Sequence, residues 1–461
     1  MASVVFLLAL PALRVSTHES LTAFIASGVR FHAEARAAQA FVQGDRYPFV
    51  REFVPSDEAR AIAGTEAKRP HVILLFLESW NGLFVDKQRP DGKPYTPVFD
   101  ARRREGLAFD FFYGNSMQSS RGHFATLCSL LPTFRGKEFT DYKGTRLHCL
   151  PEVLRSAGYR TLFRSATAEP DFEGGKVFFE RIGFERAEFE DPGSAASNPQ
   201  FWGTGLQDDA FYRQLFARID RQIAEHPGEP TFTVATNTSN HYPFRERPGH
   251  VTAPGEATQR RGDYVASIGA ADAWLAVFFE ELEKRPELRD AIVVLTGDHS
   301  FPADEHGIHF NGLGSYEEAF RTGVMVRWPG HVAPAIVKDR AASQIDLAPT
   351  ITDLLQLRHR THFLGQSLVA GEPPQPAAMV QPYDGVRLVA VRWPFKLVRH
   401  LAAEQEQLYD LAKDPREEHD LLGPGGSGGA AQELPALRDA IVRIHANQAL
   451  LRADRVWPGA P

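Results

Sequence analysis

The sequence predicts an α/β fold in which a central, mostly parallel sheet is sandwiched by helices, with a small antiparallel subdomain toward the C-terminus. Short apolar runs lie far apart along the chain and alternate with helical patterns, as expected of parallel strands buried on both faces. After about residue 375, short strand-like pieces follow one another through close turns, which is typical of an antiparallel sheet.

The strands expected in the central sheet are short and predominantly apolar. They span residues 71–77, 159–163, 231–235, 291–296 and 323–327. The segments expected to form the covering helices repeat apolar residues at helical spacing. They span residues 150–157, 208–225, 264–282 and 345–357. The small sheet is expected from residues 388–392, 395–399 and 407–409, and a last helix from residues 434–451.

These patterns divide the chain into four segments. Residues 69–375 form the main α/β domain, and residues 376–422 form the small β subdomain. Residues 423–461 form a glycine-rich linker and a terminal helix. Residues 1–68 hold an apolar segment and a helical arm. The apolar segment is shorter than the roughly 20 residues that span a bilayer, so it fits either the end of a transmembrane helix or a helix packed on the protein.

The composition excludes several classes of protein. With 43% hydrophobic and 24% charged residues in 461, the chain has the balance of an ordered globular protein. Its net charge of -7 does not favour nucleic acid as a partner. Cys128 and Cys149 are the two cysteines, too few for a disulfide scaffold or a zinc cluster. A single bridge and two free thiols both fit the sequence.

Candidate metal ligands follow two of the expected strands. Glu78 comes directly after residues 71–77, and Asp298 and His299 follow residues 291–296. Ligands of open α/β sheets bind at the carboxyl ends of the strands, and carboxylate with imidazole suits manganese, zinc or magnesium. Each motif alone fits a helix cap or a turn. Their matching positions in the expected sheet favour convergence on one divalent cation.

A candidate nucleophile begins the helix expected after a polar, glycine-containing loop in residues 114–132. Ser119 lies at the N-terminus of this helix, where free N–H groups and the positive end of the dipole suit a tetrahedral anion. A serine there is either a helix cap or a nucleophile with a metal-activated hydroxyl. Arg121, two residues further on, is expected to pair with the oxygens of the anion.

The segments LLFLES, QSSRGHFATLCSLLP, SNHYPF and LTGDH, in this order, resemble the lipoteichoic acid synthase-like branch of the alkaline phosphatase and sulfatase superfamily. The resemblance extends over most of residues 70–422 and implies an alkaline phosphatase-like fold. It implies that one divalent metal ion is held by Glu78, Ser119, Asp298 and His299, with Ser119 as the nucleophile. Mn²⁺ is the expected metal, with Mg²⁺, Zn²⁺ and Ca²⁺ as alternatives.

The resemblance also implies substrate contacts. His241, within SNHYPF, is expected to contact the substrate anion, and Trp202 belongs to an FWG segment that resembles an element of this branch. His306 and His309 follow the Asp-His pair, where they are candidates for further anion contacts, ligands of a second metal, or plain surface histidines. Few acidic residues accompany them, so a single metal is favoured and His309 is retained as a substrate contact.

The residues around the nucleophile depart from the sulfatase pattern. Sulfatases make formylglycine from a Cys or Ser that stands four residues before an arginine, and here Met117 stands four residues before Arg121. Ser116 is followed at this spacing by a serine. A single acid, Glu78, stands where sulfatases have an acid pair. Hydrolysis of sulfate esters through formylglycine is therefore disfavoured.

Three functions remain from this reading. The first is a phosphotransferase or phosphodiesterase, similar to phosphoglycerol transferases, that acts on small or lipid-linked glycerophosphate-type substrates. The resemblance implies association with the inner membrane and a periplasmic catalytic domain. The second is a sulfatase-like hydrolase of sulfate or phosphate monoesters. The third is a non-catalytic homologue that keeps the anion pocket, and it differs from the others in requiring no nucleophile.

Overall fold

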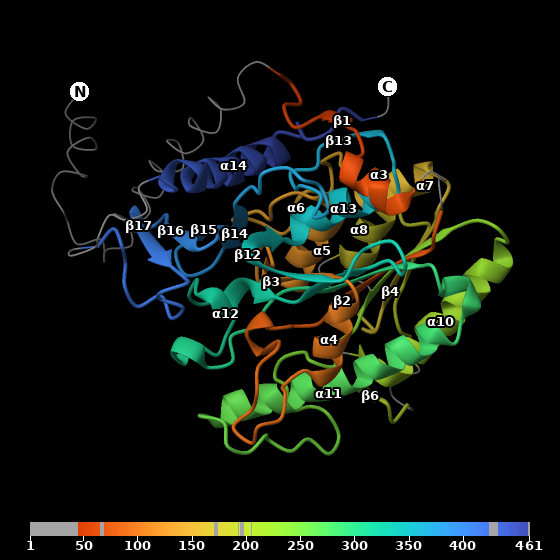
Figure 1. Ribbon diagram of the computed structural model, residues 1–461, viewed down its shortest axis with the longest axis horizontal. Coiled ribbons are helices and arrows are strands. Elements are labelled where there is room, and N and C mark those ends of the chain that lie inside the picture. Colours follow the sequence, from red (N-terminus) through yellow and green to blue (C-terminus); the bar gives the residue numbers. More distant parts are fainter. Residues whose placement is uncertain are drawn as a thin grey trace.

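The computed structural model describes residues 45–64, 69–169, 174–191, 193, 198–203, 205–423 and 432–459. The apolar segment and helical arm expected near the N-terminus lie outside these residues, as does most of the glycine-rich linker. A large helix-covered sheet and a smaller sheet at one end make up the described protein (Figure 1). Among the described helices, none is both long enough and apolar enough to span a bilayer.

The described part of the chain builds a central sheet of nine strands, most of them parallel. In spatial order they are β10 (Arg321–Thr322), β3 (Leu107–Tyr113), β11 (Val324–Arg327), β9 (Ile292–Gly297), β2 (Val72–Leu77), β8 (Thr231–Thr236), β4 (Arg160–Ser165) and β5 (Arg186–Glu188), with β12 (Ala335–Ser343) paired to β3. The expected mostly parallel sheet is confirmed, and all five predicted strands are present.

Five strands depart from the pattern found in the sequence. β11 runs antiparallel to β9, because the chain between them forms loops, a 3-10 turn (Glu305–Gly307), the single-turn helix α12 (Glu317–Phe320) and short β10, without a crossover helix. β3, β5, β10 and β12 were not predicted. β12 carries exposed charged residues along its first half, so it lacks an apolar run.

Alternating side chains of β2 belong to two separate cores, as expected for a strand buried on both faces. Val72, Leu74 and Phe76 lie in one core, and Ile73, Leu75 and Leu77 lie in the other. The first core also contains α5 (Ser119–Cys128), α7 (Leu150–Ser156), α8 (Gly175–Arg181) and α13 (Leu347–Leu354). The second contains α4 (Pro97–Arg102), α10 (Asp208–Glu225) and α11 (Gln259–Glu283), on the opposite side of the sheet in Figure 1.

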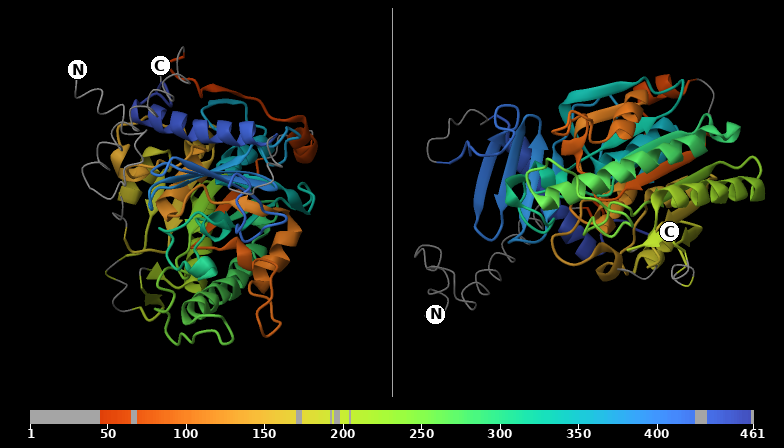
Figure 2. Two further views of the ribbon diagram at one scale, coloured as in Figure 1. Left: turned by 90° about the vertical axis from the view of Figure 1, so that its left-hand side faces the viewer. Right: turned by 90° about the horizontal axis from the view of Figure 1, so that it is seen from below.

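The small C-terminal sheet is antiparallel, as predicted, and is itself covered on both faces. Its strands are β14 (Ala377–Gln381), β15 (Arg387–Arg392), β16 (Phe395–His400) and β17 (Gln405–Asp410). Helix α14 (Leu434–Arg452) packs on one face (Figure 2). Met379, Val389 and Val398 on the other face form a core with Tyr113 and Phe320 of the main domain.

A disulfide joins Cys128, the last residue of α5, to Cys149, which directly precedes α7. Both cysteines are fully buried. The structure therefore selects the bridge over the two free thiols that the sequence left open. The bridge ties α5, the helix that begins at the candidate nucleophile Ser119, to its neighbour on the same face of the sheet.

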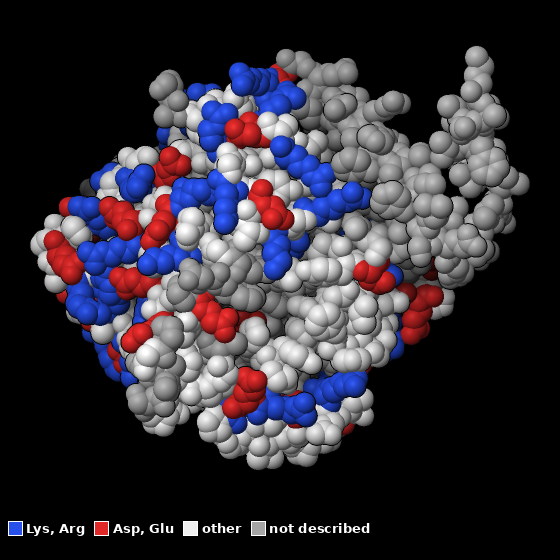
Figure 3. Space-filling view, turned by 180° about the vertical axis from the view of Figure 1, so that it is seen from behind, with Lys and Arg blue, Asp and Glu red and all other residues white. Residues whose placement is uncertain are grey.

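Charged side chains of both signs are interspersed on the face seen in Figure 3. Among the described residues on that face, basic side chains do not form one unbroken stripe that follows an element of the fold. On this face the mixed pattern differs from the continuous basic surface typical of nucleic-acid binding, and the net charge of -7 agrees with that.

A buried ion cluster fixes the small sheet to the main domain. Lys396 of β16 is fully buried, and its Nζ lies 2.9 Å from Glu417 Oε2 and 3.2 Å from Glu317 Oε1. The Tyr113 hydroxyl donates to Glu317 Oε2 at 2.9 Å. Burial raises the pKa of Glu417 to about 7. One cation thus offsets two buried carboxylates from different parts of the chain.

We predict that Lys396→Met lowers the free energy of unfolding by about 3–5 kcal/mol, because it leaves two carboxylates buried without their cation. Urea denaturation measures this loss. Lys413→Met is the matched control, since Lys413 pairs with Asp410 at 2.8 Å but its side chain is 84% exposed. The control should cost at most about 1 kcal/mol, and equal effects of the two changes would contradict the role given to Lys396.

Candidate active site

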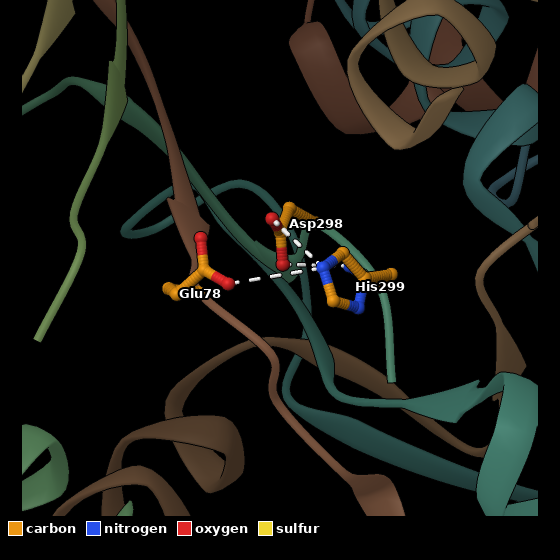
Figure 4. A group of neighbouring side chains, drawn as sticks. All are labelled: Glu78, Asp298 and His299. Carbon is orange, nitrogen blue, oxygen red and sulfur yellow. Dashed lines mark hydrogen bonds and ion pairs between the residues drawn. The ribbon is translucent and has the colours of Figure 1, made fainter. Parts of the chain in front are cut away.

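Two neighbouring parallel strands end in the predicted metal ligands. β2 and β9 pair with Leu77 opposite Gly297, so Glu78 leaves the sheet beside Asp298 and His299. Figure 4 shows the three side chains pointing toward one another. One ligand atom from each lies within 4.8 Å of the others, and all three residues are buried. The convergence predicted from the two strand ends is therefore present.

The Glu78 end of the group is held by its neighbours. The Glu78 backbone N–H donates to Asn237 Oδ1 at 2.7 Å, and the Ser79 hydroxyl donates to Glu78 Oε1 at 2.6 Å. Ser79 adopts a left-handed backbone conformation with φ of 51°. This conformation is costly for serine and is typically found where the surrounding structure enforces it at a functional site. The Ser79 N–H in turn donates to Asp298 Oδ1 at 2.8 Å.

The His299 ring is oriented by a hydrogen bond to its own neighbour. Nδ1 lies 2.7 Å from the Ser300 carbonyl oxygen, which makes Nδ1 the protonated nitrogen. Nε2 faces the two carboxylates, 3.6 Å from Asp298 Oδ2 and 3.7 Å from Glu78 Oε1. The Ser300 hydroxyl donates to the Glu318 carbonyl oxygen at 2.7 Å, which holds this turn in place.

The donor set fits one divalent cation. Asp298 Oδ2 is buried and has no hydrogen-bond partner among the described residues. Burial and the neighbouring Asp298 carboxylate raise the pKa of Glu78 well above its usual range. Two buried carboxylates this close together are stabilised by a positive charge between them, and the imidazole beside them offers a further ligand atom. Carboxylate oxygen and imidazole nitrogen together suit Mn²⁺, Zn²⁺ or Mg²⁺.

Ser119 is the first residue of α5 and lines a cavity of about 170 Å³ together with Glu78. The cavity therefore joins the predicted nucleophile to the predicted metal site. His241 also lines it, with an exposed ring whose Nδ1 lies 2.7 Å from the Tyr242 carbonyl oxygen. The helix N-terminus beside the cavity offers backbone N–H groups that have no partner within the helix.

Helix α5 packs directly against the turn that carries the candidate metal ligands Asp298 and His299. Only glycine at position 122 allows the two backbones to come this close. A Cβ atom on Gly122 would lie 1.8 Å from the Asp298 carbonyl oxygen. Gln344 Nε2 donates to the same oxygen at 2.7 Å and to the Gly297 carbonyl at 2.8 Å. The distance between the start of α5 and the metal ligands is therefore set by backbone contact.

Arg121 does not contact the cavity, so the expected pairing of this residue with an anion is wrong. Its guanidinium is buried, 3.0 Å from Glu138 Oε1, and donates to the carbonyl oxygens of Thr133 and Gly136. The physical reason is helix geometry. Two residues beyond Ser119, a side chain points about 200° around the helix from the nucleophile.

The other predicted contacts are dispersed. His309 lines a separate cavity of about 530 Å³, between the loops that carry Tyr242 and Phe301. Trp202 lies half-buried on β6 (Phe201–Trp202) and is not among the side chains that line the Ser119 cavity.

His306 has both ring nitrogens engaged, 2.8 Å from Glu318 Oε1 and 2.8 Å from the Arg416 carbonyl. His306 is thus not arranged as a metal ligand or an anion contact.

Polar residues after β8 were missed as parts of the site. Asn237 donates to Asp208 Oδ2 at 2.7 Å, while Asp208 Oδ1 accepts from the Ser239 N–H at 3.0 Å. Burial raises the pKa of Asp208 to about 6. Asn240 Nδ2 donates to the Ser79 carbonyl at 3.1 Å. Their position after a third parallel strand was the available signal, because β8 ends at the same edge as β2.

Comparison with known proteins agrees with this geometry. The model of the sulfatase family matches residues 70–357, more than half of the chain and all three residues of the triad. The chain belongs to the sulfatase family. The model of the C-terminal region of N-sulphoglucosamine sulphohydrolase matches residues 304–435, which include the small antiparallel sheet.

Curated relatives include lipoteichoic acid synthases. This sulfatase-family chain is 23% identical over 358 residues to the lipoteichoic acid synthase-like protein YvgJ of Bacillus subtilis, covering 73% of the chain and 56% of the relative. It is 26% identical over 320 residues to lipoteichoic acid synthase 2 of the same species, covering 66% of the chain and 47% of the relative. The chain thus spans about half the length of these relatives and is their distant homologue.

Solved structures share the fold. A protein in the alkaline phosphatase superfamily from Vibrio parahaemolyticus matches with a TM-score of 0.69 at 20% identity, covering 93% of this chain and 96% of the other. The lipoteichoic acid synthase LtaP from Listeria monocytogenes matches with a TM-score of 0.63 at 17% identity, covering 87% and 97%. The alkaline phosphatase-like fold implied by the sequence segments is therefore confirmed.

We predict that Gly122→Ala destabilises the protein by about 1–3 kcal/mol or more, because the added methyl group collides with the Asp298 carbonyl. Thermal unfolding with and without Mn²⁺ measures both the loss and the metal-dependent shift. Gly269→Ala in α11 is the control, since a Cβ atom there meets nothing within 4 Å. That change should be neutral or stabilising by up to about 1 kcal/mol, and a tolerated Gly122→Ala would contradict the close contact.

We predict that Asp298→Asn weakens Mn²⁺ binding more than the roughly 10–100-fold caused by losing a hydrogen-bond partner of a ligand. Calorimetric titration of metal-free protein gives the affinity and the number of ions bound. His309→Gln is the control, because His309 lines the other cavity. Unchanged binding in Asp298→Asn, or a second ion lost with His309→Gln, would count against a single site at the triad.

Proposed function

We propose that this sulfatase-family protein is a metal-dependent phosphotransferase or phosphodiesterase with Ser119 as its nucleophile. One observation carries the proposal: Ser119 and Glu78 line the same cavity, and Glu78 belongs to the buried group that fits a divalent cation. The substrates proposed are glycerophosphate-type or related esters of the cell envelope. Support for this substrate class comes from the distant relatives, which are lipoteichoic acid synthases.

The residues divide the reaction between them. Ser119 Oγ attacks phosphorus in line with the leaving oxygen, the P–O bond to the leaving alcohol breaks, and that alcohol takes up a proton. N–H groups in the first turn of α5 and the ring of His241 are available to stabilise charge on the non-bridging oxygens. A cation held by Glu78, Asp298 and His299 would supply Lewis-acid activation of the hydroxyl. Water or an acceptor alcohol then releases the phosphoryl group from Ser119.

The surroundings of Ser119 favour phosphate over sulfate chemistry. Ser116 donates to the Val380 carbonyl oxygen at 2.7 Å and is buried, and Met117 is buried as well. Neither residue lines the cavity, so neither supplies a formylglycine in the site. A sulfatase-like hydrolase is the second candidate, and the match of residues 304–435 to a sulphohydrolase C-terminal region supports it.

The disulfide supports a compartment outside the cytoplasm. Stable disulfides form in oxidising compartments and are rare in reducing ones, and Cys128–Cys149 bridges two buried elements beside the site. We therefore propose a periplasmic catalytic domain associated with the inner membrane, where lipid-linked phosphoesters are accessible. The expected apolar segment before residue 45 lies outside the described residues.

We predict that Ser119→Ala reduces kcat/KM for nitrophenyl phosphoesters by at least about a thousandfold, because the nucleophile is lost. Nitrophenyl phosphate, bis-nitrophenyl phosphate and nitrophenyl sulfate are assayed with Mn²⁺, Mg²⁺, Zn²⁺ or Ca²⁺. Ser120→Ala is the matched control, since Ser120 lines the same cavity but follows the nucleophile.

The three substrates separate the candidate functions. Phosphoester turnover that requires metal and Ser119 supports the proposal. Turnover of the sulfate ester alone would favour the sulfatase-like alternative. Phosphoester turnover that survives in Ser119→Ala, with Ser120→Ala equally active, would contradict the nucleophile assignment, and absence of all turnover and of phosphoester binding would contradict the function itself.

A further inference from the structure

A histidine that the proposed reaction does not use lies in the same cavity as the nucleophile. His123 is on α5, four residues after Ser119, so the two side chains lie on the same face of the helix. Both residues line the cavity of about 170 Å³. His123 is only 5% exposed, so its ring forms part of the inner wall.

The surroundings of this imidazole are aromatic. Its ring centroid lies 4.4 Å from Phe76, 5.7 Å from Phe179 and 6.0 Å from Phe163, each in an edge-to-face arrangement. Nε2 is buried and has no hydrogen-bond partner in the part of the chain that the structure describes. An unpaired polar atom in such a site costs stability. A phenylalanine would suit this packing better, so a structural role does not account for the imidazole.

Other buried polar groups of the cavity have their hydrogen bonds within the protein. The Ser165 hydroxyl accepts from the Thr167 N–H at 3.2 Å, and the Asn237 amide is bound to Asp208 and to Glu78. His123 therefore differs from these neighbours in having a ring nitrogen without a hydrogen bond to any described residue, so a molecule bound in the cavity is a candidate partner. Burial lowers its pKa to about 4, which keeps the ring uncharged at neutral pH.

The position along the helix indicates which part of a substrate reaches this ring. Four residues of α-helix advance about 6 Å. When a phosphoryl group is bound at Ser119, His123 is therefore at the right distance to contact atoms that lie a few bonds away from phosphorus. Phe163 and Phe179, which lie beside His123, line the same cavity and suit the carbon skeleton of an ester substituent. An uncharged imidazole among aromatic rings suits a hydroxyl group better than an anionic oxygen.

We propose that His123 is a specificity-determining residue that hydrogen-bonds a hydroxyl group on the ester substituent that stays on phosphorus when Ser119 attacks. This proposal rests on the proposed phosphoester function. Within the glycerophosphate-type substrates already proposed, it assigns to His123 the preference for a hydroxylated substituent on phosphorus. The rings of Phe163 and Phe179 contact the carbon chain, and the imidazole forms a hydrogen bond with the hydroxyl group.

The test uses two esters that differ only in a hydroxyl group exchanged for a methyl group: 3-hydroxypropyl and butyl nitrophenyl phosphate. In the Mn²⁺-loaded full chain, we expect kcat/KM to favour the hydroxylated ester by about ten- to hundredfold. His123→Phe should abolish this preference through KM while melting at or above the temperature of the wild type. His123→Gln, which keeps an amide in place of the ring, should retain part of the preference.

The controls separate this proposal from the function it rests on. Binding of both esters to Ser119→Ala, measured by calorimetry with Mn²⁺, should show the same preference without turnover, and the double variant with His123→Phe should lose it. If turnover survives in Ser119→Ala, the assignment of Ser119 as nucleophile is contradicted. The comparison of the two esters still tests the role of His123 in that case. Equal affinity and turnover for the two esters in the wild type, failure to bind either, or a preference that persists in His123→Phe overturns the role of His123.

Discussion

The site depends on the parallel pairing of β2 with β9. This register puts Glu78 beside Asp298 and His299 at the carboxyl edge of the sheet, in a volume from which water is largely excluded. Like charges brought together at low dielectric repel strongly. The raised pKa of Glu78 and the unpartnered Oδ2 of Asp298 are two consequences of this one arrangement. Both indicate a positively charged ligand as the group that stabilises the edge.

Amide side chains, rather than further charges, hold the ends of these strands. Asn237 and Asn240 bind the backbone at Glu78 and Ser79, and Gln344 binds the carbonyls that flank Asp298. Because these amides bond mainly to backbone, carboxylate oxygens of the triad stay available to a cation. Asp208 then orients Asn237 from the start of α10. Neutral anchors fix the ligands without adding to the electrostatic repulsion between them.

Sequence reasoning succeeded where local pattern determines position. Glu78 and Asp298 follow apolar runs, and buried parallel strands bring their carboxyl ends to one edge whatever the loops between them do. Arg121 was misjudged because adjacency along a helix is not adjacency in space. His309 depends on the course of loops, which hydrophobic periodicity does not encode. His123 was overlooked because its neighbours on the helix are apolar, and such a pattern predicts residues packed in the hydrophobic core.

The cavity is lined by both polar and aromatic side chains, and this mixture bears on the kind of ester it suits. Glu78 and Ser119 contribute polar groups, and Phe163 and Phe179 contribute aromatic rings. A phosphate monoester would leave the rings in contact with water, which is unfavourable. A diester could place its second substituent against the rings and release that water. The mixed lining therefore supports the proposed diester substrate, which would be held by charge at the phosphoryl group and by apolar contact along the substituent.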